Sequence, residues 1–432
     1  MTEQTEQTPP TIGIDGQPLI DEYQAYRKWG ARMIIAGFLL LTVSAVVSAW
    51  WQAESNIPIA DDIGKLGVHL LLDDGRNRWD SDLWTEHIAY ADAISSENGI
   101  AVQVIRSDDL SPERWQQYLD LAEQHQLTPV LRLATTFDFE NGWWTAPTPD
   151  ADGSYVTWGE NYADFLNSLT WYSDQKYVIL LNEPNNGHEW GGNPDPEAYA
   201  QFVVGVASVL REQVEDIVIL NGAFDLNLPN TNGQPFPNSN VVLIDANTFL
   251  ERMEASEAGI FNTFDIWNSH PYPLDIRAHP SQQVYRFDAM NGAEITAETP
   301  PDGIYNRGIN GYEWELWKLA QLGYDNTHWQ IMITETGWRH NNPVNAESAD
   351  SAPDYPSPEQ IADFFQLAFM GDEDADYIGW LQDERVLSVA IFALNGVHDE
   401  WSHTNLLQVD ANGNILGQYA HYDALATIAD TE

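Results

Sequence analysis

Two glutamates, Glu183 and Glu335, each follow a short apolar run, and the two runs lie far apart in the chain. The first run covers residues 177–181 and the second covers residues 330–333. Both have the composition of buried parallel strands, which would deliver each carboxylate at the carboxyl-terminal tip of a strand. Two carboxylates that meet in one cleft can hydrolyse a glycosidic bond, because one protonates the leaving oxygen while the other attacks the anomeric carbon or activates water.

The surroundings of the two glutamates predict different roles. A carboxyl group in an apolar cleft has a raised pKa and can hold a proton near neutral pH, which suits Glu183 as the general acid. Asn182 beside it is a candidate ligand for a sugar 2-hydroxyl. Glu335, if it stays ionised, can attack the anomeric carbon. A separation of about 5–5.5 Å between the carboxyl groups would imply retention, and about 6.5–9.5 Å would imply inversion.

A third polar segment, residues 268–273, follows another apolar run and contains His270 and Tyr272. Both side chains can donate or accept hydrogen bonds. We expect them to contact the two glutamates and fix their orientation.

The elements that must position these residues alternate along the chain after residue 64. Apolar runs suited to buried strands cover residues 66–72, 100–105, 129–133, 177–181, 217–220, 264–267, 330–333 and 388–394. Amphipathic stretches between them predict helices over 82–94, 112–125, 161–172, 196–213, 312–322 and 358–370. Eight such units predict an α/β fold, a (β/α)8 barrel. A doubly wound sheet is the alternative, but residues 73–76 are not the glycine-rich phosphate loop that it usually carries.

Several predicted strand-to-helix connections are long, namely 134–158, 184–195, 221–240, 270–311 and 336–357. In a barrel they all rise from the carboxyl-terminal face, where such enzymes place their active sites. The chain has 18 tryptophans. Trp143, Trp190 and Trp338 fall in these connections, and Trp401 falls in the loop after the eighth predicted strand. Aromatic planes stack on sugar rings, so we expect these four to bind substrate.

Together these motifs resemble the clan A glycoside hydrolases, over roughly residues 64–432. That clan is a (β/α)8 barrel with an Asn-Glu acid/base pair after strand four and a nucleophilic Glu after strand seven, which Asn182-Glu183 and Glu335 match. The resemblance to family 5 within the clan implies that His270 and Tyr272 belong to its strand-six motif. It also implies that Arg106 lies near the nucleophile, with Arg132 competing for that role. No His follows strand three, so family 39 and other families remain open.

The amino-acid composition limits the kinds of partner and cofactor that the protein can bind. The net charge is -48, from 66 acidic and 18 basic residues, and a chain this acidic repels nucleic acid. The chain has no cysteine, which excludes disulfides and thiolate chemistry. It also lacks the common spacings of metal-binding histidines. We therefore expect neither a metal nor another cofactor.

The first part of the sequence predicts a membrane anchor. Residues 1–32 read as a disordered cytoplasmic tail. Residues 33–51 carry no charge and as a helix would span about 28 Å, close to the thickness of a bilayer core. Arg27, Lys28 and Arg32 before this segment place the rest of the chain outside. A cleaved signal peptide and a buried core helix are the alternatives. Residues 52–63 would form a linker to a catalytic domain over 64–432.

The sequence thus predicts a single-pass protein of the cell membrane whose outward-facing barrel cleaves β-glycosidic bonds of an oligo- or polysaccharide with retention. One alternative is a catalytically silent carbohydrate-binding barrel. Another is a transglycosylase that acts on cell-surface glycans with the same residues. The sugar, the linkage and the oligomeric state are left open by the sequence.

Overall fold

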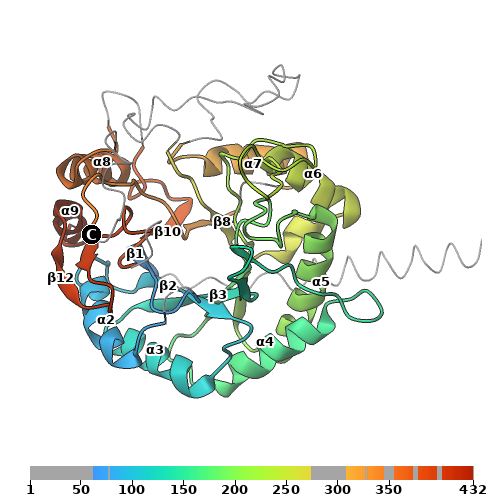
Figure 1. Ribbon diagram of the computed structural model, residues 1–432, viewed down its shortest axis with the longest axis horizontal. Helices are drawn as coiled ribbons and strands as arrows, with labels where there is room; N and C mark the ends of the chain where they lie inside the picture. The colour runs from blue at the N-terminus through green and yellow to red at the C-terminus, as the bar shows by residue number, and fades with distance from the viewer. Residues whose placement is uncertain are drawn as a thin grey trace, which may run out of the picture. The chain divides into compact units, whose positions relative to one another are not determined.

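Eight parallel strands form a nearly closed barrel (Figure 1). The computed structural model describes residues 62–75, 78–273, 308–325, 327, 329–344, 355–372, 378–396 and 401–431. In chain order the barrel strands are β1 (Gly64–Leu70), β2 (Gly99–Arg106), β3 (Thr128–Ala134), β6 (Lys176–Leu180), β7 (Ile217–Leu220), β8 (Trp267–Ser269), β9 (Ile331–Ile333) and β10 (Val386–Ile391). Sequential strands are neighbours and β10 pairs with β1. A single parallel bridge from Leu220 to Ile266 joins β7 to the segment that leads into β8.

Helices surround this barrel (Figure 1). They are α2 (Trp84–Asp92), α3 (Pro112–Gln124), α4 (Val156–Ser168), α5 (Pro196–Gln213), α6 (Ala246–Ser256), α7 (Tyr312–Gln321), α8 (Pro358–Met370) and α9 (Ala420–Ala429). Short 3-10 helices cover Ser81–Leu83 and Ile260–Thr263. Two small hairpins, β4 (Phe137–Asp138) with β5 (Trp143–Trp144) and β11 (Leu407–Val409) with β12 (Ile415–Gln418), lie outside the barrel sheet.

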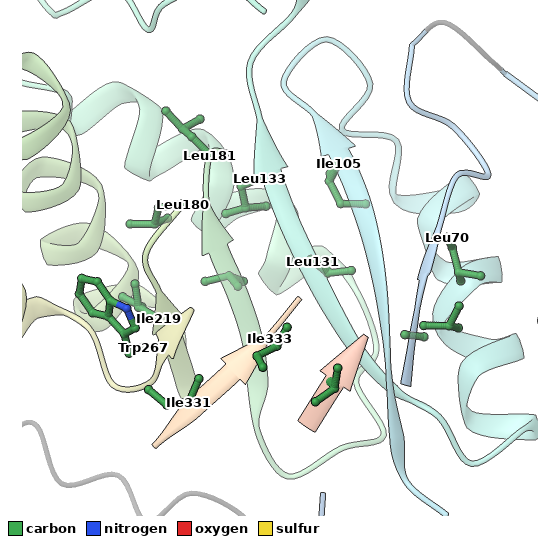
Figure 2. Packing of buried hydrophobic residues seen from close by; sticks show 14 of the residues in the cluster. Leu70, Ile105, Leu131, Leu133, Leu180, Leu181, Ile219, Trp267, Ile331 and Ile333 are labelled. Atoms are coloured by element: carbon green, nitrogen blue, oxygen red, sulfur yellow. The ribbon is translucent and has the colours of Figure 1, made fainter. Parts of the chain in front are cut away.

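Alternation along the strands separates two apolar layers. Leu131 and Leu133 of β3 belong to the layer between the strands and the helices, part of which is shown in Figure 2. Val130 of the same strand belongs to a smaller cluster that fills the barrel with Ile100, Ile179 and Met332. Arg132 has the parity of Val130, so its side chain enters the barrel and not the helical layer.

Most predicted elements agree with the structure, and two of the predicted helices, α3 and α8, begin at side-chain caps. Ser111 accepts a hydrogen bond from the Arg114 amide, and Ser357 forms a capping box with Gln360. The helix predicted over 161–172 instead spans Val156–Ser168, and no side-chain cap marks its start. The predicted strand over 264–267 is shifted to Trp267–Ser269, since these residues pair with β9. Two helices, α6 and α9, were not predicted.

The predicted membrane segment, residues 33–51, lies outside the described residues, as do the tail before it and most of the linker. Among the helices that the structure does describe, none combines the length and the apolar composition needed to cross a bilayer. The anchor stays a prediction from the sequence.

A buried carboxyl group behind β8 should make the free energy of unfolding depend on pH. Glu315 of α7 is fully buried and bonded by the Ser269 hydroxyl, and burial raises its pKa to about 8. The folded state therefore keeps a proton that the unfolded state releases above its ordinary pKa of 4.5. This group costs stability progressively as pH rises from about 4.5 to about 8, at roughly 1.4 kcal/mol per pH unit.

We expect Glu315→Gln to remove this slope. Measured by chemical unfolding at several pH values, the variant should gain roughly 3–5 kcal/mol relative to the wild type between pH 4.5 and 8. Ser269→Ala serves as a control, because it alters the same contact and leaves the titrating group in place. A difference between Glu315→Gln and wild type that does not change with pH would contradict the assignment.

Candidate active site

Glu183 stands at a strained strand end. β6 ends at Leu180, and both Leu181 and Glu183 then adopt left-handed backbone conformations, with φ of 69° and 31°. Such conformations in residues other than glycine cost on the order of 1–3 kcal/mol each and persist only where the surroundings hold them. Here the Glu183 amide donates a hydrogen bond of 2.7 Å to the Gly222 carbonyl, in the loop after β7. This geometry turns the Glu183 side chain into a cleft.

Glu335 follows β9 and lies against three polar side chains from other parts of the barrel. The Arg132 guanidinium binds its Oε1, and the Tyr272 hydroxyl donates to its Oε2 over 3.3 Å. The His69 Nε2 lies 3.4 Å from Oε1. Arg132 also donates to the Asn182 Oδ1 over 2.9 Å, so one guanidinium connects the residues that follow β6 and β9.

The two carboxyl groups meet at the same point of the cleft. One oxygen of Glu183, one oxygen of Glu335 and a His270 nitrogen all lie within 4.8 Å of one another. Retaining glycosidases hold their carboxyl groups about 5–5.5 Å apart, whereas inverting ones leave about 6.5–9.5 Å for a water. The separation therefore suits a direct attack by one carboxylate.

The surroundings push the pKa values of the two groups in opposite directions. Burial raises the pKa of Glu183 well above its usual value, and the Asp225 and Glu335 carboxylates add to this shift. Burial also acts to raise the pKa of Glu335. The charge of Arg132 and the hydrogen bond from Tyr272 oppose this effect, and the pKa of Glu335 lies below its usual value. Near neutral pH the pair thus consists of a protonated Glu183 and an ionised Glu335.

A chain of hydrogen bonds fixes which nitrogen of His270 carries its proton. Asn268 Nδ2 donates to the Asn221 carbonyl over 3.1 Å, which leaves Asn268 Oδ1 to accept the Thr334 hydroxyl over 2.7 Å. The Thr334 oxygen can then only accept, over 3.1 Å, from Nε2 of His270.

Burial lowers the pKa of His270, so its ring is neutral near neutral pH and has a single N–H. With that proton on Nε2, Nδ1 is an acceptor. It lies 2.9 Å from Oε1 of Glu183. The hydrogen bond between them therefore needs the proton of Glu183, which agrees with the raised pKa of that carboxyl group.

The expected position of Arg106 beside Glu335 is wrong. The Arg106 guanidinium lies 3.5 Å from Asp73 and 3.1 Å from Asp108. The strand register explains the difference, because Val104 of β2 is level with Arg132 of β3. Arg106 stands two residues further along, where its side chain meets the acidic loop after β1. Arg132 occupies the place next to Glu335.

The tryptophans divide into two groups. Trp338 and Trp401 line the cleft together with Glu183, Glu335 and Tyr272. Trp190 instead is buried against Tyr199 of α5, and the Trp143 ring packs over Gly192, so neither belongs to this cleft lining. A tryptophan in a long loop is as useful for anchoring the loop as for contacting a ligand, and the sequence does not separate the two uses.

The site also contains residues that were not predicted, among them His69 and Asp225. His69 is fully buried on β1, and its position in an otherwise apolar run was a readable signal. Asp225 lies in the loop after β7 and lines the cleft. Its sequence context, a polar residue in a long loop, differs little from that of many other acidic residues in the chain.

Asp225 should affect the pH dependence of catalysis. Its carboxylate raises the pKa of Glu183, second only to burial. Replacing it by Asn removes a negative charge, stabilises the Glu183 anion and lowers that pKa. We expect the alkaline limb of the kcat/KM profile to move to lower pH in Asp225→Asn. Asp410→Asn, in the turn of the β11–β12 hairpin, is the control and should leave the limb in place. An unmoved limb in Asp225→Asn would show that its charge does not reach Glu183.

Within the described residues, Glu183, His270 and Glu335 are also the side chains with metal-ligand spacing. Their environment favours proton chemistry instead. Glu335 is bonded to the Arg132 guanidinium, whose charge would repel a cation. His270 directs Nδ1 to Glu183 and Nε2 to Thr334, so both ring nitrogens are engaged.

Solved structures with a similar course of the chain are glycoside hydrolases by their titles. The GH39 enzyme from Xanthomonas axonopodis pv. citri has a TM-score of 0.49 and 12% identity, over 88% of this chain and 68% of that chain. A family 1 β-glucosidase from Thermotoga maritima has a TM-score of 0.44 and 16% identity, over 81% and 86%. A fungal β-1,4-galactanase has a TM-score of 0.46 and 12% identity, over 84% and 99%. No protein-family model and no curated protein matches the sequence.

Proposed function

We propose that this protein is a retaining glycoside hydrolase, with Glu335 as nucleophile and Glu183 as acid/base. The observation that carries the proposal is the pair itself. Two carboxyl oxygens lie within 4.8 Å, and their surroundings set the two pKa values in opposite directions. A binding protein has no need for a carboxyl group kept protonated beside an ionised one, whereas glycoside cleavage needs both.

The geometry supports a double displacement. Glu335 attacks the anomeric carbon while the glycosidic C–O bond breaks, and the proton of Glu183 passes to the leaving oxygen. Glu183, now a carboxylate, takes a proton from water, and that water attacks the anomeric carbon and breaks the bond to Glu335. Tyr272 and Arg132 keep the Glu335 carboxylate in place. Asn182, whose Oδ1 accepts a hydrogen bond from Arg132, is our candidate for binding a sugar hydroxyl.

The substrate we propose is a β-linked oligo- or polysaccharide. The cleft has a volume of about 340 Å³ and is lined by aromatic and polar side chains, among them Trp338, Trp401 and Asn227. This combination suits a sugar, whose C–H faces pack on aromatic rings while its hydroxyl groups form hydrogen bonds. The β configuration is the one that the resemblance to clan A implies.

We also propose that residues 33–51 anchor the catalytic domain at the outer face of the cell membrane. Support comes from the uncharged segment and from the basic residues before it. Full-length protein should sediment with membranes, and protease added to intact spheroplasts should digest the barrel. Protease resistance of the barrel in intact spheroplasts, with digestion after lysis, would contradict the orientation.

The central test is hydrolysis of a panel of β-linked glycans and aryl β-glycosides by residues 57–432, the compact unit that contains the barrel, followed by NMR of the first anomer released. Retention requires the β-anomer to appear first and mutarotate later. Release of the α-anomer first would refute the nucleophile assignment. Sugar binding with no turnover would favour the silent binding barrel, and transfer to an added acceptor in place of hydrolysis would favour the transglycosylase.

A further inference from the structure

Arg339 stands out among the arginines that the structure describes. The structure describes eight arginines, and seven of them form an ion pair with a carboxylate: Arg78, Arg106, Arg114, Arg132, Arg211, Arg252 and Arg385. Arg339 forms none with any described residue, and it donates a hydrogen bond of 3.4 Å to the Tyr355 hydroxyl. In a chain with 66 acidic and 18 basic residues, a guanidinium without a carboxylate partner among the described residues calls for a physical reason.

Its place in the fold supplies that reason. Arg339 lines the same cleft as Glu183 and Glu335, in the loop that follows β9. The residues on either side of it are buried. Trp338 packs against Phe364 and Phe365 of α8, and the amide of His340 donates a 2.7 Å hydrogen bond to the His403 carbonyl. The exposed Arg339 is therefore held at the cleft between two fixed neighbours.

The carboxyl groups that line the cleft interact with groups other than Arg339, so an anion of the substrate could bind next to it. Glu335 is paired with Arg132, and Glu183 is protonated near neutral pH. The remaining carboxylate of the lining, Asp225, acts on Glu183. The charge of Arg339 acts on Tyr272 instead. It offsets part of the rise that burial and Glu335 cause in the pKa of that hydroxyl.

From these observations we infer that the substrate carries an anionic group, a uronate carboxylate or a sulfate ester, which Arg339 binds. This inference rests on the proposed glycosidase function and narrows its substrate class to acidic glycans. A guanidinium presents five donors in a planar fork, which matches both anions, and one donor to Tyr355 leaves the others available. Because the whole chain is strongly negative, an acidic glycan needs a local cation of this kind to settle in the cleft.

The test compares polymers that share one backbone. For β-1,4-glucan, β-1,4-mannan and β-1,4-galactan, we would measure kcat/KM on the neutral polymer, on its C6-oxidised (uronate) form and on its sulfated form. A salt concentration of about 0.5 M shortens the range of the general repulsion by the acidic surface. We expect wild type to prefer one of the charged forms. Arg339→Gln should lower kcat/KM on that form about 10- to 100-fold, as expected for a lost charge-assisted hydrogen bond, and change the neutral form little.

Two variants serve as controls. Arg252→Gln removes the same charge from α6, on an exposed ion pair with Glu197, and should leave the preference unchanged. Arg339→Lys keeps the charge without the fork, so a partial loss indicates charge and a full loss indicates bidentate binding.

The failures of the two proposals can be told apart. If wild type cleaves neutral polymers or aryl glycosides as well as the charged ones, or if Arg339→Gln impairs both forms equally, the acidic-glycan inference falls and the glycosidase assignment stands. If none of the charged polymers is cleaved, the inference falls as well. If no polymer and no aryl glycoside is cleaved, the glycosidase assignment falls with it. The preferred charged form distinguishes a carboxylate from a sulfate.

Discussion

Glu335→Gln is expected to lower kcat/KM on a cleaved glycan by roughly 10⁴- to 10⁶-fold, the range seen when a covalent nucleophile is removed. The amide has nearly the same shape as the carboxylate, so Arg132 and Tyr272 keep a partner and the fold should persist. The variant loses the carboxylate charge that attacks the anomeric carbon. Glu197→Gln, an exposed residue at the start of α5, is the matched control and should retain full activity.

A rescue experiment separates loss of the nucleophile from loss of structure. In Glu335→Ala the shortened side chain leaves space on the face from which the carboxylate would attack. Azide can then bond to the anomeric carbon while Glu183 still protonates the leaving oxygen. The product should be the α-glycosyl azide, identified by NMR. Full activity of Glu335→Gln, or formation of the β-azide in Glu335→Ala, would refute the assignment of Glu335.

Glu183→Gln should lose activity in a way that depends on the leaving group. General acid catalysis contributes roughly 10²- to 10⁴-fold, and a sugar alkoxide cannot leave without a proton. We therefore expect a loss of that size on glycans. On a dinitrophenyl β-glycoside the first step should be nearly unchanged, because this phenolate leaves unprotonated. Pre-steady-state release of dinitrophenol measures that step directly.

The same variant position gives the mirror image of the azide result. In Glu183→Ala the glycosyl–enzyme bond to Glu335 still forms, and azide would attack it from the opposite face, so the β-glycosyl azide is expected. Equal losses on the glycan and on the dinitrophenyl glycoside would contradict the acid role. The two azide configurations together assign one role to each glutamate without reference to any relative.

Much of the fold could be predicted because its signals are local. The eight apolar runs needed only composition and spacing, and the caps at Ser111 and Ser357 marked two helix starts. The helix α6 also carried a local signal, since Asp245 accepts from the Thr248 amide as its N-cap. It was missed because it lies inside a stretch expected to be a long loop.

The residues of the site were harder to predict where their contacts depend on how far along the barrel axis each side chain lies. Arg106 and Arg132 both lie on strands whose ends form the cleft. An arginine in an apolar run does not by itself show how far along the barrel axis its side chain lies. The register between β2 and β3 decides that Arg132 reaches Glu335. The pKa difference between the glutamates likewise depends on Asp225 and Arg132, which come from distant parts of the sequence and become neighbours only in the closed barrel.

The left-handed backbone at Leu181 and Glu183 bears on how this protein would respond to selection in the laboratory. A glycine in place of Glu183 would adopt the same conformation without strain and would remove a buried carboxyl group, so stability alone does not favour the present residue. Leu181 differs, because its side chain is buried in the core. Variants chosen only for heat resistance should therefore accumulate changes at the end of β6 and lose turnover. Variants chosen for turnover should keep this segment and gain their stability elsewhere in the barrel.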